Sequence, residues 1–217
     1  MAIRLTRPGS QDPITERAIL LVDGVNDQRF FGAAASHRGL TSLQIITLQG
    51  SASLRAKLRA VINTPGFSSV VKLGIARDAD TNPSASFQRA CDACRNEGLS
   101  VPARPLVAEG SSSSSSSPVV SIMILPDISS TGELAHLCLR SLSDDQRYSE
   151  CVIEFMACLN KYQPQLMGNR RAKAELHAYL AGMDNPGLRF GEAAEVGYFP
   201  WTSPALAEVF QFLDTLK

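Results

Sequence analysis

The strongest constraint on the fold is an alternation of short apolar segments with amphipathic segments of helical period. Apolar runs occur at residues 18–22, 42–48, 69–76 and 119–125. This alternation is typical of βαβ units, and runs that are apolar throughout suit strands covered on both faces. We therefore expect an α/β, Rossmann-like three-layer sandwich with a mostly parallel sheet.

The sequence becomes helical after residue 130. Further helical patterns occur at residues 132–142, 146–162 and 170–180 and after residue 204. We expect an α/β domain at residues 1–130 and a helical C-terminal part at residues 131–217 that packs on or beside it. A serine-rich segment at residues 110–118 has no large side chains to bury, so we expect a solvated surface loop there.

Charge and cysteine content narrow the classes of function. Lys+Arg and Asp+Glu both number 21, so the formal net charge is zero. This balance argues against a broad basic surface for duplex nucleic acid and makes self-association easier. No apolar run has the length of a transmembrane helix, and the first residues do not resemble a signal peptide. The odd number of cysteines, five, indicates reduced thiols, so we expect a cytoplasmic protein with no membrane association.

Acidic residues follow three of the four expected strands. Asp23 follows the first, Asp78 and Asp80 follow the third, and Asp127 follows the fourth. Because sites in open parallel sheets form where the carboxyl ends of strands meet the following loops, we expect these carboxylates to converge. Hard oxygen ligands favour Mg²⁺ or Mn²⁺, which suits phosphate chemistry. The alternative is that Asp78 or Asp80 only caps the helix that begins near Asn82.

The segments that carry these acids resemble a known family. Residues 21–31 (LVDGVNDQRFF) resemble the VEGxxDxxFF opening of Toprim domains, and residues 77–80 (RDAD) resemble their DxD element. Residues 125–134, 173–181 and 191–204 resemble later segments of a small bacterial and archaeal Toprim-like family of unknown function. The resemblance runs across nearly the whole chain except the serine-rich segment.

The resemblance implies a function in nucleic-acid chemistry. Toprim domains occur in topoisomerases, primases and nucleases of the overcoming-lysogenization-defect type, where a first-strand Glu and the DxD pair bind Mg²⁺ and carry phosphodiester chemistry. By that resemblance Asp23, Asp78 and Asp80 are expected as catalytic and metal-binding residues of a nuclease-like phosphodiesterase. Two positions depart from the pattern: Asp23 is one methylene shorter than Glu, and the acid of a later GxLE element falls on Ala135, two residues after Glu133.

Two functions therefore stay open at this point. One is Mg²⁺- or Mn²⁺-dependent cleavage of nucleic acid. The other is a catalytically degenerate Toprim fold that binds nucleic acid or a partner protein. A homodimer or a partner ATPase is an expected associate in either case.

Other reactive side chains are expected to be structural. Cys91 and Cys94 form a C-x-x-C within a helical pattern, which favours core packing over a redox or zinc site. The histidines are scattered over three expected helices, and His136 is the strongest ligand candidate because it lies near Asp127. The aromatic group at residues 198–201 is expected to pack on the sheet rather than to stack on bases.

Overall fold

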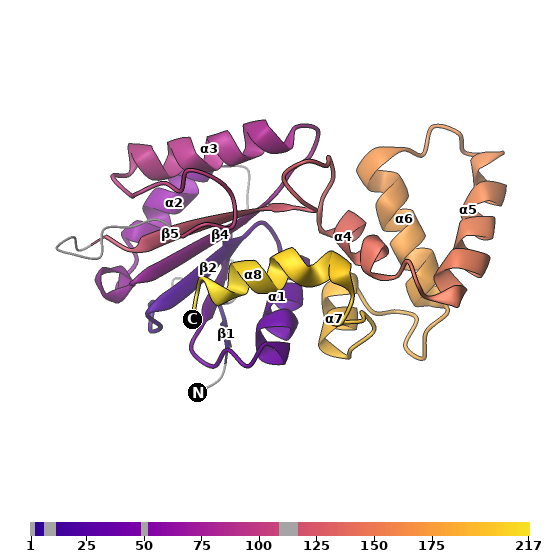
Figure 1. Ribbon diagram of the computed structural model, residues 1–217, viewed down its shortest axis with the longest axis horizontal. Helices are drawn as coiled ribbons and strands as arrows, with labels where there is room; N and C mark the ends of the chain where they lie inside the picture. The colour runs from indigo at the N-terminus through magenta and orange to yellow at the C-terminus, as the bar shows by residue number, and fades with distance from the viewer. Residues whose placement is uncertain (1–2, 7–11, 49–51, 109–116) are drawn as a thin grey trace.

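A five-stranded parallel sheet lies between helices on its two faces (Figure 1). The computed structural model describes residues 3–6, 12–48, 52–108 and 117–217. The strand order is β1-β3-β2-β4-β5, and every neighbouring pair is parallel. The strands are β1 (Arg4–Leu5), β2 (Ala18–Val22), β3 (Gln44–Thr47), β4 (Lys72–Asp78) and β5 (Val119–Leu125). The expected α/β three-layer architecture is confirmed.

Eight α-helices follow or flank these strands. They are α1 (Val25–His37), α2 (Leu54–Ile62), α3 (Pro83–Asn96), α4 (Leu134–Ser141), α5 (Ile153–Asn160), α6 (Gly168–Ala181), α7 (Phe190–Glu195) and α8 (Ala207–Asp214) in the described part of the chain. A π-helical segment, η2 (Arg147–Val152), leads directly into α5, and short 3₁₀ turns lie at Phe67–Ser69 and Pro204–Leu206.

Local sequence signals set the limits of α2 and α3. The Ser53 hydroxyl accepts the Ala56 N–H at the start of α2, and the Asn82 side chain accepts the Ala85 N–H at the start of α3. Pro83 occupies the first turn of α3, where its missing N–H costs no hydrogen bond. Gly98, just beyond the end of α3, has a φ of 74°, a left-handed conformation that glycine adopts without strain.

Helices α2 and α3 cover one face of the sheet, and the core beneath them contains the C-x-x-C pair. Cys91 and Cys94 are both buried among apolar side chains. Burial raises the pKa of the Cys94 thiol to about 12, so this thiol stays protonated near neutral pH. The expectation that these cysteines pack in the core is confirmed.

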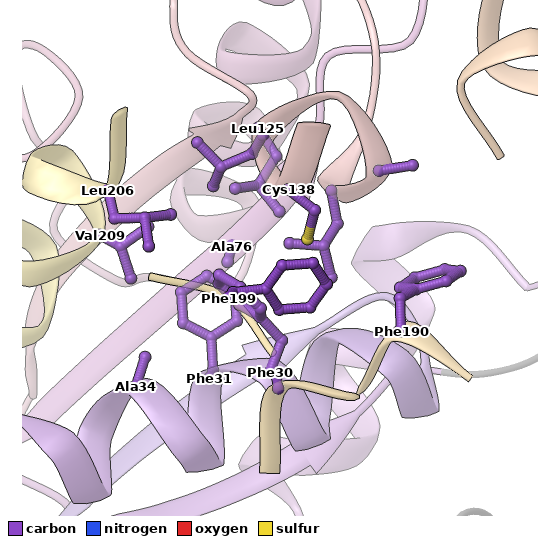
Figure 2. Close-up of a cluster of buried hydrophobic side chains, with 14 of the residues drawn as sticks. Phe30, Phe31, Ala34, Ala76, Leu125, Cys138, Phe190, Phe199, Leu206 and Val209 are labelled. Carbon is purple, nitrogen blue, oxygen red and sulfur yellow. The ribbon is translucent and has the colours of Figure 1, made fainter. Parts of the chain in front are cut away.

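The other face is covered by α1 and α8, which lie far apart in the sequence, and side chains of α4 and α7 join the same core. Figure 2 shows Phe30 and Phe31 of α1 beneath Leu125 of β5 and Cys138 of α4, with Phe199 between them. The rings of Phe30 and Phe31 are edge-to-face, with centroids 5.7 Å apart. This core therefore forms only when the N-terminal and C-terminal parts of the chain meet.

Helix α8 lies close to the sheet because β4 carries a glycine beneath it. A Cβ atom at Gly74 would lie 2.9 Å from Leu216 Cδ1 and 3.1 Å from Phe212 Cζ. A side chain at this position would push the C-terminal segment outward. The C-terminal part thus supplies a layer of the sandwich, while the predicted boundary at residue 130 stays a prediction.

Helices α5 and α6 lie at one end of the molecule, at the right of Figure 1, and α4 lies between them and the sheet. The predicted loop at residues 110–118 lies almost wholly outside the described residues, which resume at Ser117. Among the described helices, the structure has none that is both long and apolar enough to span a membrane.

Candidate acidic site

Two of the predicted acids meet at the carboxyl ends of adjacent strands. Asp23 directly follows β2, and Asp78 is the last residue of β4, the strand that pairs with β2. The Asp78 N–H donates to Asp23 Oδ2 over 3.3 Å. The sheet register therefore brings these two residues together, as the parallel-strand argument predicted.

The third predicted acid, Asp80, stands beside them on a short backbone bridge. Its N–H and C=O bond to the C=O and N–H of Gly132, both over 2.8 Å. The Asp80 backbone is left-handed, with a φ of 52°, and its side chain is exposed. The bridge fixes the loop after β4 against the loop after β5.

Two further carboxylates join this group, Asp27 and Glu133. Asp27 lies in the first turn of α1, one helical turn beyond Asp23, and Glu133 is the N-cap residue of α4. Glu133 is only 7% exposed. The charges of Asp23, Asp27, Asp80 and Glu133 all act on Asp78. We call these five residues the acidic cluster.

The pKa values show how crowded the acidic cluster is. Burial, followed by the charges of Asp27 and Asp23, raises the pKa of Asp78 to about 8. Burial and the charge of Asp23 raise the pKa of Asp27 to about 7. Burial also raises the pKa of Asp23, although the nearby Arg77 opposes the rise. Such shifts arise when like charges share a space that water enters poorly.

Two cations partly balance these charges from either side. Arg77 Nη1 lies 2.6 Å from Asp23 Oδ1, and Lys173 Nζ of α6 lies 2.9 Å from Glu133 Oε1. The second contact is an ion pair without hydrogen-bond geometry, since Oε1 is buried and accepts no hydrogen bond from the described residues. Lys173 therefore offsets the charge of Glu133 without fully satisfying its oxygen.

The donor chemistry suits a hard cation, while the side-chain arrangement is not that of a formed metal centre. Carboxylate oxygens are the ligands that Mg²⁺ and Mn²⁺ prefer. Among the residues described, no three His, Cys, Asp or Glu side chains are grouped so that they could hold a metal ion. Both oxygens of Asp23 already have partners, Arg77 and the Asp78 N–H.

The structure does not bring Asp127 into the acidic cluster. Its Oδ1 accepts the backbone N–H groups of Ser129 and Ser130 over 2.7 and 2.8 Å, and its Oδ2 pairs with Arg140. Burial acts against ionisation, yet the hydrogen bonds from Ser129 and Arg140 hold the pKa of Asp127 well below its usual range. Its charge acts on Glu208 rather than on Asp78.

The capping alternative for Asp78 and Asp80 is resolved by Asn82, which caps α3 instead. Asp78 Oδ1 accepts the Leu134 N–H over 3.3 Å, so it contacts the start of α4, not of α3.

His136, the strongest ligand candidate among the histidines, also lies at the start of α4, where its Nδ1 accepts the Glu133 N–H over 3.2 Å. Burial lowers the pKa of His136, which favours the neutral ring that this bond requires.

The aromatic group at residues 198–201 packs inward, as expected. Phe199 is buried, and the Trp201 ring lies 5.5 Å from that of Phe30 and 5.8 Å from that of His37. Phe199 and Trp201 therefore belong to the aromatic core around Phe30, and Tyr198 and Trp201 are half-buried.

Three surface cavities lie elsewhere in the described structure. One, of about 280 Å³, is lined by residues of β1, α1 and α7 and by Trp201. A second, of about 440 Å³, is lined by Arg147, Tyr179 and Tyr198 among others, and a third, of about 330 Å³, by Asp127, Arg140 and Glu208 among others. None of these three is lined by a member of the acidic cluster.

The fold and the cluster define an α/β protein with a parallel sheet and a crowded group of carboxylates at the carboxyl edge of its central strands. Residues 17–217 match the model of a family described as "Protein of unknown function (DUF3226)", and the chain belongs to that family. No curated protein and no solved structure gives a match.

Proposed function

We propose that the acidic cluster binds Mg²⁺ or Mn²⁺ and that the protein uses this cation for phosphodiester cleavage of nucleic acid in the cytoplasm. The observation that carries the proposal is the crowding of Asp23, Asp27 and Asp78 at the carboxyl edge of the sheet. Burial raises the pKa of all three, and neighbouring carboxylates add to the rise, so either protons or a divalent cation would relieve the cost of these charges. The resemblance to Toprim domains stays a prediction that agrees with this site.

Asp23 and Asp78 are the residues that would hold the cation, with Asp80 at the open side. Binding would exchange one positive charge for another at Asp23, since Arg77 occupies Oδ1 of that carboxylate. A divalent cation bound there would polarise a phosphate and lower the pKa of an attacking water. Asp27, whose pKa lies near 7, can hold or release a proton beside this place at neutral pH.

Nucleic acid is the proposed substrate because a bound divalent cation can contact its phosphates. The protein itself has no net positive charge that would attract them. The formal net charge of zero gives no broad electrostatic attraction to phosphates. Weak, cation-dependent binding is the expected mode, and a partner ATPase or a second copy of the chain is the proposed associate.

A second function is favoured by the two ion pairs. Arg77 and Lys173 already offset the charges of Asp23 and Glu133, and the position of the expected later acid is Ala135. A cluster whose charge is partly offset in this way depends less on a bound cation. We propose as the alternative a catalytically inactive module that binds nucleic acid or a partner protein.

A cation titration followed by thermal unfolding separates the two proposals. For the first, Mn²⁺ should stabilise the wild type by about 2.7 kcal/mol at a hundredfold excess over Kd. Asp78→Asn should abolish the shift, and Asp127→Asn should retain it because Asp127 lies outside the cluster. Plasmid and single-stranded DNA should be nicked only by the protein with its cation.

Each outcome of the titration and the nicking assay supports one of the two proposed functions. A cation shift without nicking supports a binding protein that has lost catalysis. An unchanged unfolding temperature in both Mg²⁺ and Mn²⁺ would contradict the proposed enzyme, and DNA binding by the same sample would then support the alternative.

A further inference from the structure

Helix α5 carries large apolar side chains that are exposed to solvent. It stands on the outer side of α6 at one end of the molecule (Figure 1). Val152 and Met156 are buried and fix α5 to the rest of the protein. Phe155, which lies on a neighbouring face of the helix, is 53% exposed. A large aromatic side chain left in solvent on a helix that is already anchored indicates a surface that meets something else.

Phe155 belongs to a row of exposed side chains. Cys151 of η2, Phe155 and Cys158 of α5, and Tyr162 just beyond the helix are all exposed, with Tyr162 at 76%. The separations of three and four residues from Phe155 to Cys158 and Tyr162 place these three along one side of α5, and Cys151 lies near the end of the π-helical segment, four residues before Phe155. That spacing is the one that two paired helices use at their contact line. We call these four residues the α5 seam.

Charged residues of opposite sign line the free flank of the α5 seam. Glu154 and Lys161 are seven residues apart and therefore lie on the same flank, the one turned away from Val152 and Met156. Within the part of the chain that the structure describes, neither has an ion-pair partner. The flank thus carries one negative and one positive charge in a fixed order.

We propose that the α5 seam binds the same seam of a second copy of this chain, with the two helices antiparallel. A two-fold axis between Phe155 and Cys158 places Phe155 of each copy against Cys158 of the other, and Cys151 against Tyr162. The same axis places Glu154 of each copy near Lys161 of the other, so two opposite-charge pairs form. A surface that matches itself in both apolar residues and charge fits a second copy.

The zero net charge of the chain supports this occupant. Two copies have no overall electrostatic repulsion to overcome when they meet. The seam is only about three helical turns long, and interfaces well below roughly 1,200 Å² are weak or transient. The dimer should therefore dissociate on dilution.

Sedimentation velocity of the full chain over a range of concentrations tests the proposal. The wild type should form a concentration-dependent dimer, and Phe155→Ser should weaken it by roughly tenfold or more. Ile153→Ser is the matched control, because Ile153 is 44% exposed on the opposite side of α5. Circular dichroism should show the same helix content in both variants, since both side chains are exposed.

Charge exchange tests the antiparallel arrangement. Glu154→Lys alone and Lys161→Glu alone should each weaken the dimer, because each sets like charges together across the axis. The double exchange, Glu154→Lys with Lys161→Glu, should restore the wild-type affinity. A wild type that stays monomeric at its highest concentration, a dimer insensitive to Phe155→Ser, or a double exchange that restores nothing would overturn the proposal.

Discussion

Arg77 Nη1 lies 2.6 Å from Asp23 Oδ1, so a cation from β4 itself neutralises the first acid of the cluster. Arg77 stands directly before Asp78 in the sequence, and the Asp78 N–H donates to the other oxygen of Asp23. One short stretch of β4 thus supplies both partners of Asp23. Any cation that binds Asp23 must compete with this arrangement.

The competition gives a first prediction, for Arg77→Gln. Removing the guanidinium leaves only the weaker effect of Lys57 to oppose the charge of Asp23, so the variant should be less stable than the wild type in buffer with a chelator. Added Mn²⁺ should stabilise the variant by more than it stabilises the wild type, as read from the two unfolding temperatures. An equal shift in both proteins would show that Asp23 is not a ligand.

A second prediction concerns pH. The pKa of Asp78 rises from 3.8 to about 8 on folding and that of Asp27 to about 7. The folded state therefore binds these protons more tightly than the unfolded state, and the stability they contribute is lost as pH rises from about 4 to about 8. Each pKa unit corresponds to about 1.4 kcal/mol.

Urea unfolding at pH 6 and pH 8 in the absence of divalent cations measures this loss, since both pH values lie in the window. Asp78→Asn should be more stable than the wild type at pH 8 by roughly 1–2 kcal/mol, because it removes a charge that burial and the neighbouring carboxylates disfavour. Its stability should also vary less between the two pH values. A wild type more stable at pH 8 than at pH 6 would contradict the raised pKa values.

A third prediction tests the contact between the sheet and the C-terminal segment. Gly74→Val should lower the free energy of unfolding by about 1–3 kcal/mol, because the new side chain meets Leu216 and Phe212. Gly187→Ala is the control, since a Cβ atom there meets nothing within 4 Å. Chemical denaturation of both variants gives the comparison, and equal stabilities would rule out the close packing of α8.

A fourth prediction concerns thiol reactivity. Cys151 and Cys158 are exposed, whereas Cys91, Cys94 and Cys138 are buried. Burial raises the pKa of all three buried thiols, which lowers their reactivity further. At a protein concentration low enough to dissociate the proposed dimer, a chromogenic disulfide reagent should therefore titrate two thiols rapidly in the native protein and five in denaturant. Rapid reaction of a third thiol in the native protein would be evidence against this core.

The fold was largely predictable from the sequence because its signals are local. The apolar runs predicted the four longer strands. Asn82, Pro83 and Gly98 predicted the two ends of α3 to within two residues. Strand β1 was missed, because Arg4 and Leu5 become a strand only by pairing with β3. Two residues carry no periodicity of their own.

The candidate site was only partly predictable, because its members meet through long-range packing. Strand ends placed Asp23 beside Asp78, yet Glu133 joins them only because α4 begins against β4. Asp27 could have been predicted as a member of the cluster, because it lies four residues after Asp23 in the first turn of α1. Asp127 follows a strand as the others do, but Ser129 and Ser130 hold it in its own loop, and no strand pattern predicts that.

The position of Leu216 above Gly74 also bears on how the protein is made. Because synthesis runs from the N-terminus, Leu20 and Phe31 leave the ribosome long before the segment at residues 206–216 that will cover their face of the sheet. Arg38 likewise forms its ion pair only after Asp214 has been synthesised. The nascent chain therefore carries an open apolar surface on this face of the sheet until residues 206–216 have left the ribosomal tunnel.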